Sequence, residues 1–498
     1  MPFSSRAGSA LLAVVLALGL ASARAEEQGL NLQLRELTQT ALDSDFKACK
    51  AINGKLQKAI ADPNFDQLGV HARGLALYVS IACAPKDGDQ GVVAARRLIV
   101  LPVEPAMLYR GQLTLLIDAH KRDAPAEYVA AIRGIAAADP SLMADWTPRD
   151  LGWILRKVKD DPALDASLLD TLHAVPWTDR AAREADANAW AVGRARHLLE
   201  AGDDARARAV LAGVTGTRQL AIVAQDRRFE RLWPQLEADG RFDWVKLVQA
   251  ELAVEQARIQ AEPNLLEPVS EALGSLRALG RYDEALALGD AYAARLRKGD
   301  IFTDAKDQRA WMLNSLAYVY SNLGRVDEAD RLMLESTGED RVSQPINRAG
   351  LLNDAGRPAE AMKVLDAVDV KNSSEYGAMW LVSGKACARL QLGDKAAAET
   401  LIAGMRGRWK DNPAALTEAL ICLGAEDEAA ALYIRRLDDP AERAGVLDDF
   451  RTTRPPPVQA PVYVQHDARR KAILARPEVM AALDKWGRPL TFPLSGSF

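Results

Sequence analysis

Histidine is scarce in this chain of 498 residues, and the signatures of several common enzyme classes are missing. The five histidines are too far apart to form HExxH or another paired zinc motif: His71, His120, His173, His197 and His466. The patterns GxSxG, GxxxxGK[ST] and GxGxxG do not occur either, so the usual nucleophile elbow, phosphate-binding loop and dinucleotide-binding turn are absent. From the sequence we therefore expect no catalytic residue, no bound metal and no cofactor.

Blocks of basic residues are also absent. The 63 Lys and Arg residues are interspersed with 68 Asp and Glu residues, whereas binding to a phosphate backbone requires clustered cations. Nucleic acid is therefore a poor candidate for a partner. Long apolar runs are confined to the N-terminus, so we expect no membrane-spanning segment in the rest of the chain.

The first 25 residues have the pattern of a secretory signal peptide. Arg6 provides a positive start, Ala10 to Leu20 is an apolar run, and the tripeptide at 23–25 fits the rule of small residues at the cleavage site. The alternative is a membrane anchor, but a run of roughly 11–14 residues is shorter than the about 20 that a helix needs to cross a bilayer. Because the chain is rich in Ala and Arg, we expect export to the periplasm of a bacterium.

Only four cysteines are present, Cys49, Cys83, Cys387 and Cys422. Exported proteins favour disulfides, and the most local of the three possible connectivities pairs Cys49 with Cys83 and Cys387 with Cys422. Each pair is separated by about one helical-hairpin period, so each bond would tie one hairpin to the next. Alternatively, the four thiols are free and fill a core as small apolar groups.

A glycine followed five residues later by an alanine recurs within stretches of apolar helical spacing. The pairs are Gly202 with Ala207, Gly280 with Ala285, Gly324 with Ala329, Gly356 with Ala361, Gly393 with Ala398 and Gly424 with Ala429. The glycine would end one helix, where a left-handed backbone is cheap only without a Cβ. The alanine would lie on the next helix and allow the two helices to approach closely. Because one hairpin cannot bury its apolar face alone, the recurrence predicts a stack of hairpins.

This pattern resembles the tetratricopeptide repeat. In the unit of Gly324, the family's large, large, small and aromatic positions on the first helix are matched by Leu313, Leu316, Ala317 and Tyr320, and its small position on the second helix is matched by Ala329. The resemblance is clearest over residues 265–435, although the repeat spacing is irregular. It implies an all-α fold, an α-solenoid of stacked antiparallel helical hairpins whose first helices line the concave side.

We divide the chain after the signal peptide into four parts. Residues 26–186 predict further, degenerate hairpins or a separate all-helical domain, and residues 187–450 predict the repeat array. Residues 451–467 are rich in proline and predict an extended linker. Residues 468–498 predict a helix and tail that cap the last repeat.

The resemblance also implies a binding groove, lined by first-helix residues that do not face the partner helix of their own hairpin. The residues at these positions are Trp311, Asn314, Tyr318, Asn322, Asn353 and Trp380. Aromatic rings would supply contact area and amides would bond backbone groups, whereas the competing interpretation of each Trp is a core residue between hairpins. We therefore expect a non-catalytic periplasmic scaffold that binds an envelope protein or peptide. The alternatives are an accessory subunit of an envelope polysaccharide or peptidoglycan machine, and an enzyme with an unrecognised site in residues 26–186.

Overall fold

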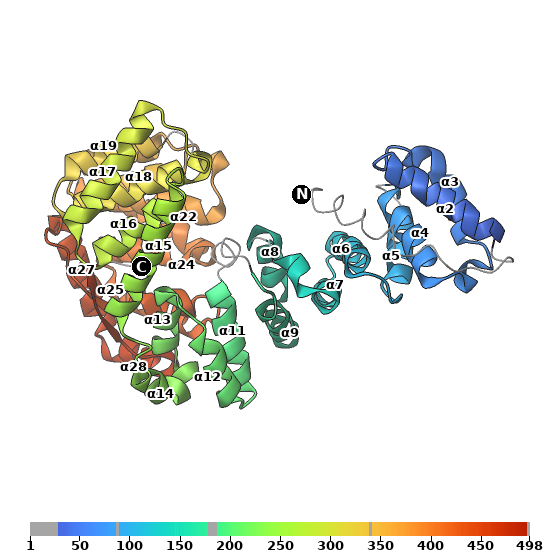
Figure 1. The fold of residues 1–498 in the computed structure, drawn as a ribbon. Helices are drawn as coiled ribbons and strands as arrows, with labels where there is room; N and C mark the ends of the chain where they lie inside the picture. The colour runs from blue at the N-terminus through green and yellow to red at the C-terminus, as the bar shows by residue number, and fades with distance from the viewer. Residues whose placement is uncertain are drawn as a thin grey trace. The chain divides into compact units, whose positions relative to one another are not determined.

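The computed structural model describes residues 28–85, 89–144, 146, 148–177, 187–337 and 341–495. The signal peptide expected at residues 1–25 lies outside these residues and remains a prediction. The chain divides into two compact units, Met1–Ala201 (unit 1) and Gly202–Phe498 (unit 2), coloured blue to green and green to red in Figure 1. Almost all regular structure is helical, and successive helices pack as pairs in both units. The predicted all-α, solenoid-like fold is therefore confirmed.

The described part of unit 1 is built from helices of nine to 18 residues. They are α2 (Gln28–Asp43), α3 (Cys49–Ile60), α4 (Val70–Ala82), α5 (Gln90–Leu98), α6 (Pro105–Arg122), α7 (Pro125–Ala138), α8 (Pro148–Val158), α9 (Pro162–His173) and α11 (Ala187–Glu200), with 3-10 turns η3 (Phe65–Gln67) and η4 (Pro140–Met143). α4 packs on α5 and α6 packs on α7, while α2, α4 and α6 contact one another in sequence. This part of the chain is thus also built from helical hairpins.

Unit 2 contains the Gly–Ala repeats. Its elements are α12 (Asp204–Ala212), α13 (Thr217–Gln225), η5 (Arg227–Leu232), α14 (Trp233–Ala238), α15 (Trp244–Ala261), α16 (Glu267–Ala278), α17 (Tyr282–Lys298), α18 (Ala305–Asn322), α19 (Val326–Ser336), α20 (Ser343–Asp354), α21 (Pro358–Asp366), η6 (Val370–Asn372), α22 (Glu375–Gln391), α23 (Lys395–Gly407), η7 (Trp409–Asp411), α24 (Pro413–Leu423), α25 (Glu426–Asp438), α26 (Arg443–Asp448), β1 (Arg451–Arg454), α27 (Pro461–Leu474), α28 (Pro477–Trp486) and β2 (Leu490–Ser495). The first helices of the hairpins, α16, α18, α20, α22 and α24, each contact the next. We call these five helices the first-helix row.

Each hairpin turn of the repeats has the geometry that its glycine permits. At all six repeat glycines φ lies between +72° and +81°, a region in which a Cβ would collide with the backbone. The alanine five residues later has no exposed surface in any of the six pairs, as predicted. These fully buried alanines are Ala207, Ala285, Ala329, Ala361, Ala398 and Ala429. The absence of a side chain at the turn and a single methyl on the second helix therefore set the packing of each hairpin.

The C-terminal part of the chain returns to the beginning of unit 2. β2 pairs in parallel with β1, starting from Leu490 opposite Arg451. The ring of Phe492 stacks on Trp244 of α15 with 4.5 Å between centroids, and Arg488 donates to the carbonyl of Ala224 at 2.7 Å. The end of unit 2 thus packs against its early elements α13, α15 and α16, and in Figure 1 the green and red parts of this unit adjoin.

The prediction for the C-terminal residues needs two changes. α27 begins at Pro461, seven residues before the predicted helix start at Ala468, because a proline fits the first turn of a helix and Pro461 opens it. The residues beyond α27 do more than cap the last hairpin: α28 packs on α25 as a cap would, but β2 continues to α15 and α16.

Both predicted disulfides are present. Cys49 is bonded to Cys83 in unit 1 and Cys387 to Cys422 in unit 2. The first joins α3 to the end of α4, and the second joins α22 to α24, two neighbours in the first-helix row. Among the described residues, we find no helix that combines the length and the apolar character required to cross a bilayer.

Candidate binding groove

A segment of the chain itself lies along the first-helix row of unit 2. We call residues 454–476 the strap: it leaves β1, runs through the proline-rich stretch and continues as α27. The backbone N–H of Val458 donates to the carbonyl of Asn322 at the end of α18, at 3.1 Å. α27 then packs on α20, α24 and α25. The turn ends of this row, including the predicted groove residue Asn322, are therefore covered in this structure by a polypeptide from the same chain.

The strap meets the row at the hairpin turns. Four turn glycines, which we call the glycine track, each face one strap residue within 4 Å of the place where a Cβ would be. The pairs are Gly280 with Arg454 at 3.9 Å, Gly324 with Val458 at 2.9 Å, Gly356 with Val462 at 3.6 Å and Gly424 with Arg469 at 4.0 Å. At Gly324 the approach is closer than a methyl group would allow. The missing side chain at Gly324 thus makes room for the strap, whereas at the other three turns a Cβ would be in ordinary van der Waals contact with it.

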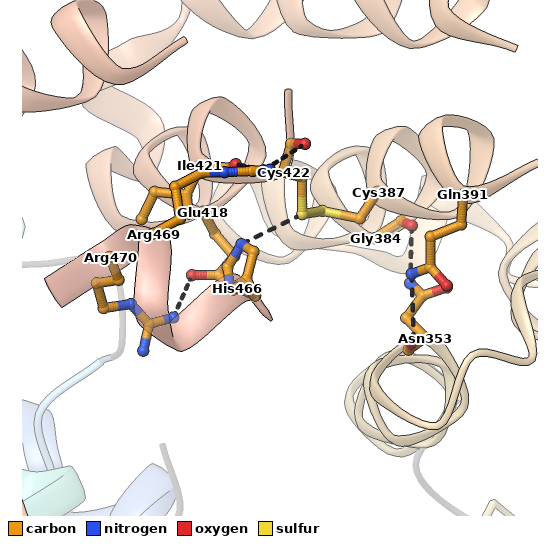
Figure 2. The surroundings of a disulfide bond; sticks show 10 residues. All are labelled: Asn353, Gly384, Cys387, Gln391, Glu418, Ile421, Cys422, His466, Arg469 and Arg470. Atoms are coloured by element: carbon orange, nitrogen blue, oxygen red, sulfur yellow. Dashed lines mark hydrogen bonds and ion pairs between the residues drawn. A yellow bond between two sulfur atoms is a disulfide. The ribbon is translucent and has the colours of Figure 1, made fainter. Parts of the chain in front are cut away.

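Charged groups fix the helical half of the strap. Arg470 donates to Glu418 of α24 at 2.8 Å, and the Nδ1 atom of His466 lies 3.2 Å from the same carboxylate. Arg469 donates to the carbonyls of Ile421 at 2.8 Å and Cys422 at 3.3 Å. These carbonyls belong to the last turn of α24, where a cation is favoured by the helix dipole and by the unpaired acceptors. Figure 2 shows the group around the disulfide.

Burial changes the proton affinity of several acids beside the strap. It raises the pKa of Asp354 at the end of α20 to about 7, helped by the negative charge of Glu418 and opposed by Arg470. It raises the pKa of Asp449 to about 6, opposed by Arg436 and Arg470. Arg470 therefore lies close to three carboxyl groups, and its positive charge offsets part of the cost of burying them.

The disulfide of unit 2 lies within the same group. The Nε2 atom of His466 is 3.4 Å from Sγ of Cys422, and burial lowers the pKa of this imidazole. A lowered pKa favours the neutral ring at neutral pH. The bond between Cys387 and Cys422 thus fixes α22 to α24 next to His466 of α27 (Figure 2).

Two of the six residues predicted to line a groove connect neighbouring hairpins. Asn353 of α20 donates from its side chain to the carbonyl of Gly384 at 3.0 Å, and its own carbonyl accepts from Gln391 at 3.1 Å. Asn314 of α18 is buried and accepts from Asn347 of α20 at 3.5 Å. These amides satisfy polar groups between first helices, which is the usual fate of buried polar side chains.

The other four predicted residues are placed differently from one another. Tyr318 is half-buried with the guanidinium of Arg277 5.6 Å from its ring centre, and Asn322 contributes its carbonyl to the strap. Trp380 is half-buried against the core at the C-terminal end of the row. Only Trp311 is exposed, with 43 % of its surface accessible. The structure therefore does not bring the six side chains together on one open surface.

Sequence reasoning missed the charged residues that hold the strap. Glu418 lies six residues before Gly424, as Tyr318 lies six before Gly324, and Asp354 lies two before Gly356, as Asn322 lies two before Gly324. The register of the repeats therefore contained the signal for both acids. Nothing in the register indicated Arg470, because the strap is not a repeat.

His197 in unit 1 has a partner that its own helix does not supply. Its Nε2 atom lies 2.8 Å from Oδ2 of the largely buried Asp165 on α9, and Arg196 contacts the same oxygen at 3.2 Å. In the structure it is part of a polar contact between α9 and α11.

The chain matches no protein-family model, and it matches no curated protein. The resemblance to tetratricopeptide repeats therefore depends on the residues quoted above and on the helical hairpins of the fold.

Proposed function

We propose that this protein is a non-catalytic scaffold of the bacterial periplasm that binds an envelope protein or peptide along the first-helix row of a degenerate tetratricopeptide-like array. The periplasmic location is supported by the signal-peptide pattern and by two disulfides, which persist in oxidising compartments. The mode of binding is shape and side-chain complementarity on a surface that the hairpins form in advance.

The observation that carries this proposal is the strap. The row and its neighbours hold the strap with a backbone hydrogen bond at Val458, apolar contacts at the hairpin turns and an ion pair at Arg470. These are the kinds of contact by which a groove recognises an extended or helical peptide. A surface that accommodates such a segment from its own chain has the chemistry to accommodate one from a partner.

The distribution of aromatic residues favours a polypeptide over a glycan. A glycan-binding row would present aromatic rings on consecutive first helices. Here α18 has the exposed Trp311 and α22 has the exposed Tyr376, but α20 between them contains no aromatic residue. Amide and carboxyl groups predominate at the turn ends of the row, and these match backbone and basic groups of a peptide.

Site-specific crosslinking in the native periplasm tests the proposal. A photo-reactive amino acid at Trp311 on α18 should give one reproducible adduct with an envelope protein, identified by mass spectrometry. The same amino acid at Leu334, which is 52 % exposed on the second helix α19, is the matched control and should not. The purified partner should then lose affinity for a folded Trp311→Ala, Tyr318→Ala double variant. Undiminished affinity in that variant would count against the row as the binding surface.

A further inference from the structure

We infer that the strap is a built-in competitor for the first-helix row, and that the row fits a partner segment with the strap's own chemistry. This inference rests on the proposed function and adds the partner's chemistry and the control of access. The partner segment would carry two small β-branched residues four positions apart, followed by an adjacent pair of basic residues. In the strap these are Val458, Val462, Arg469 and Arg470.

The register of the strap against the row is the first argument. Arg454, Val458 and Val462 are each four residues apart and face the turns at Gly280, Gly324 and Gly356 in order. A segment that advances by a constant number of residues per hairpin is aligned with the repeat itself. The turns at Gly280, Gly324 and Gly356 therefore define regularly spaced places for side chains of a segment that is extended up to the start of α27. A small apolar side chain fits where the row has no Cβ, and a larger one at the Val458 position would collide with the turn.

The charges at the far end of the track are the second argument. On the row, Glu418 and Asp354 are acidic, and on the strap the adjacent Arg469 and Arg470 are basic. Asp449, at the end of α26, adds a third acid near Arg470. A partner that replaced the strap without bringing a cation would leave the partly buried Glu418 without its partners Arg470 and His466, which is unfavourable. The row therefore selects a basic segment.

Unequal attachment of the two halves of the strap is the third argument. Val458 is 46 % exposed although it is apolar, and the prolines beside it are exposed or half-buried. At the other end, Ile473 and Leu474 are part of the apolar core shared with α24 and α25. The extended half has few contacts to lose and the end of α27 has many, so displacement starts at Val458 while the anchored end keeps the strap attached to unit 2.

Binding of a strap peptide in trans tests the inference. The probe is a fluorescent peptide with the sequence of residues 454–476, and the receptor is the full mature chain. Wild type should bind it weakly, because the tethered strap acts at an effective concentration in the millimolar range. Arg470→Glu breaks the pairing with Glu418 in cis, so its affinity for the peptide should rise by about tenfold or more, since the tethered competitor is then weakened. Lys471→Glu, an equal change of charge at an exposed neighbour, should leave the affinity at the wild-type level.

A charge swap provides the decisive comparison. The double variant Glu418→Arg, Arg470→Glu restores an attractive pair between row and strap but repels the wild-type peptide, so the gain in affinity should disappear. A folded Arg470→Glu chain that binds no more peptide than wild type would overturn the inference. Equal binding of a peptide with Val458→Asp and Val462→Asp would also overturn it. So would the formation of an Arg470→Glu dimer in which the two chains exchange straps, because the row would then bind a second copy of this chain.

If Arg470→Glu does not fold, a protease site inserted after Pro457 in the otherwise unchanged chain replaces it. Cleavage leaves the anchored end in place and frees the extended half, so peptide exchange should become faster after cleavage, and an unchanged rate would contradict the inference. The crosslinking experiment at Trp311 separates the two proposals. If a native partner is found but the strap variants do not change peptide binding, only the inference that the strap is a competitor is refuted. If the strap variants change peptide binding but no native partner is found, only the proposed scaffold function is refuted.

Discussion

Arg470 of α27 and Glu418 of α24 form an ion pair, 2.8 Å between nitrogen and oxygen, that joins residues 52 positions apart in the sequence. Both side chains are less than one third exposed, so their attraction is screened less than that of a surface pair. The pair links the strap to the first-helix row, and it does so beside the disulfide that fixes two helices of that row.

A double-mutant cycle should measure this link. We expect the coupling free energy between Glu418→Gln and Arg470→Gln to be about 1–2 kcal/mol, since partial exposure reduces it below the value for a fully buried pair. The matched control is Arg281 with Glu284, an exposed pair at 2.6 Å, whose coupling should be too small to measure because solvent screens it. Urea unfolding of unit 2 provides the measurement. Equal couplings for the two pairs would show that the strap is not held by this contact.

The glycine track allows a comparison of two chemically identical substitutions. Gly324→Ala and Gly393→Ala both place a Cβ at a turn with φ near +80° and should both lose about 1–2 kcal/mol from backbone strain. At Gly324 the added Cβ would lie 2.9 Å from Val458. At Gly393 no atom of another part of the chain lies within 4 Å of the added Cβ. Gly324→Ala should therefore cost about 1 kcal/mol more.

Shortening Val458 should relieve the additional loss. The free energy of unfolding of Gly324→Ala, Val458→Ala should match that of Gly393→Ala, Val458→Ala to within about 0.5 kcal/mol if the collision is the cause. A persistent difference between the two double variants would place the extra cost elsewhere than in the contact with the strap.

Stability should depend on pH through Asp354. Because the folded chain raises the pKa of this carboxyl to about 7, the folded state retains a proton that the unfolded state loses above about pH 4. Its contribution is therefore present at low pH and is lost as the pH rises from about 4 through about 7. Asp354→Asn removes this loss. The free energy of unfolding of the variant should therefore exceed that of wild type by about 1–3 kcal/mol at pH 8, and the difference should disappear towards pH 4.

Chemical denaturation at pH 4, 6 and 8 checks the pH dependence. Asp484→Asn on the exposed side of α28 is the control for loss of a surface carboxylate. The pKa of Asp449 is raised to about 6. The free energy of unfolding of the Asp354→Asn chain should therefore still fall as the pH rises, but less steeply than that of wild type. A gap that widened towards acid would contradict the assignment.

Each disulfide should stabilise only its own unit. Replacing Cys387 and Cys422 by alanine should lower the free energy of unfolding of unit 2 by about 2–4 kcal/mol, since the bond closes a loop of 35 residues. Replacing Cys49 and Cys83, which close a loop of 34 residues, should lower that of unit 1 by a similar amount. Calorimetry of the two variants should show different transitions shifted, and a shift of the same transition in both would show that the units unfold together.

Local geometry of the hairpins could be predicted from the sequence alone. A turn glycine at φ above +70° and a fully buried alanine five residues later depend on sterics within a few positions, so they recur wherever the same short pattern recurs. The pairing of cysteines followed from the same period, because a separation of one hairpin brings two helices of neighbouring hairpins together. In unit 1 the hairpins expected over residues 26–186 are present in the described residues, whereas a helix such as α5, only nine residues long, shows too few turns for periodicity to identify it.

Tertiary structure alone decided where the strap goes. Its path depends on Arg470 reaching Glu418 and on Val458 meeting Gly324, and the position of β2 beyond it depends on Phe492 stacking on Trp244. These contacts span from about fifty to about 250 residues. No period in the sequence relates such positions, because one member of each pair lies outside the repeats. The turns could be predicted because steric exclusion acts between residues that are neighbours in the chain. The position of the strap on the row could not be predicted, because packing and charge act between residues that only the folded chain brings together.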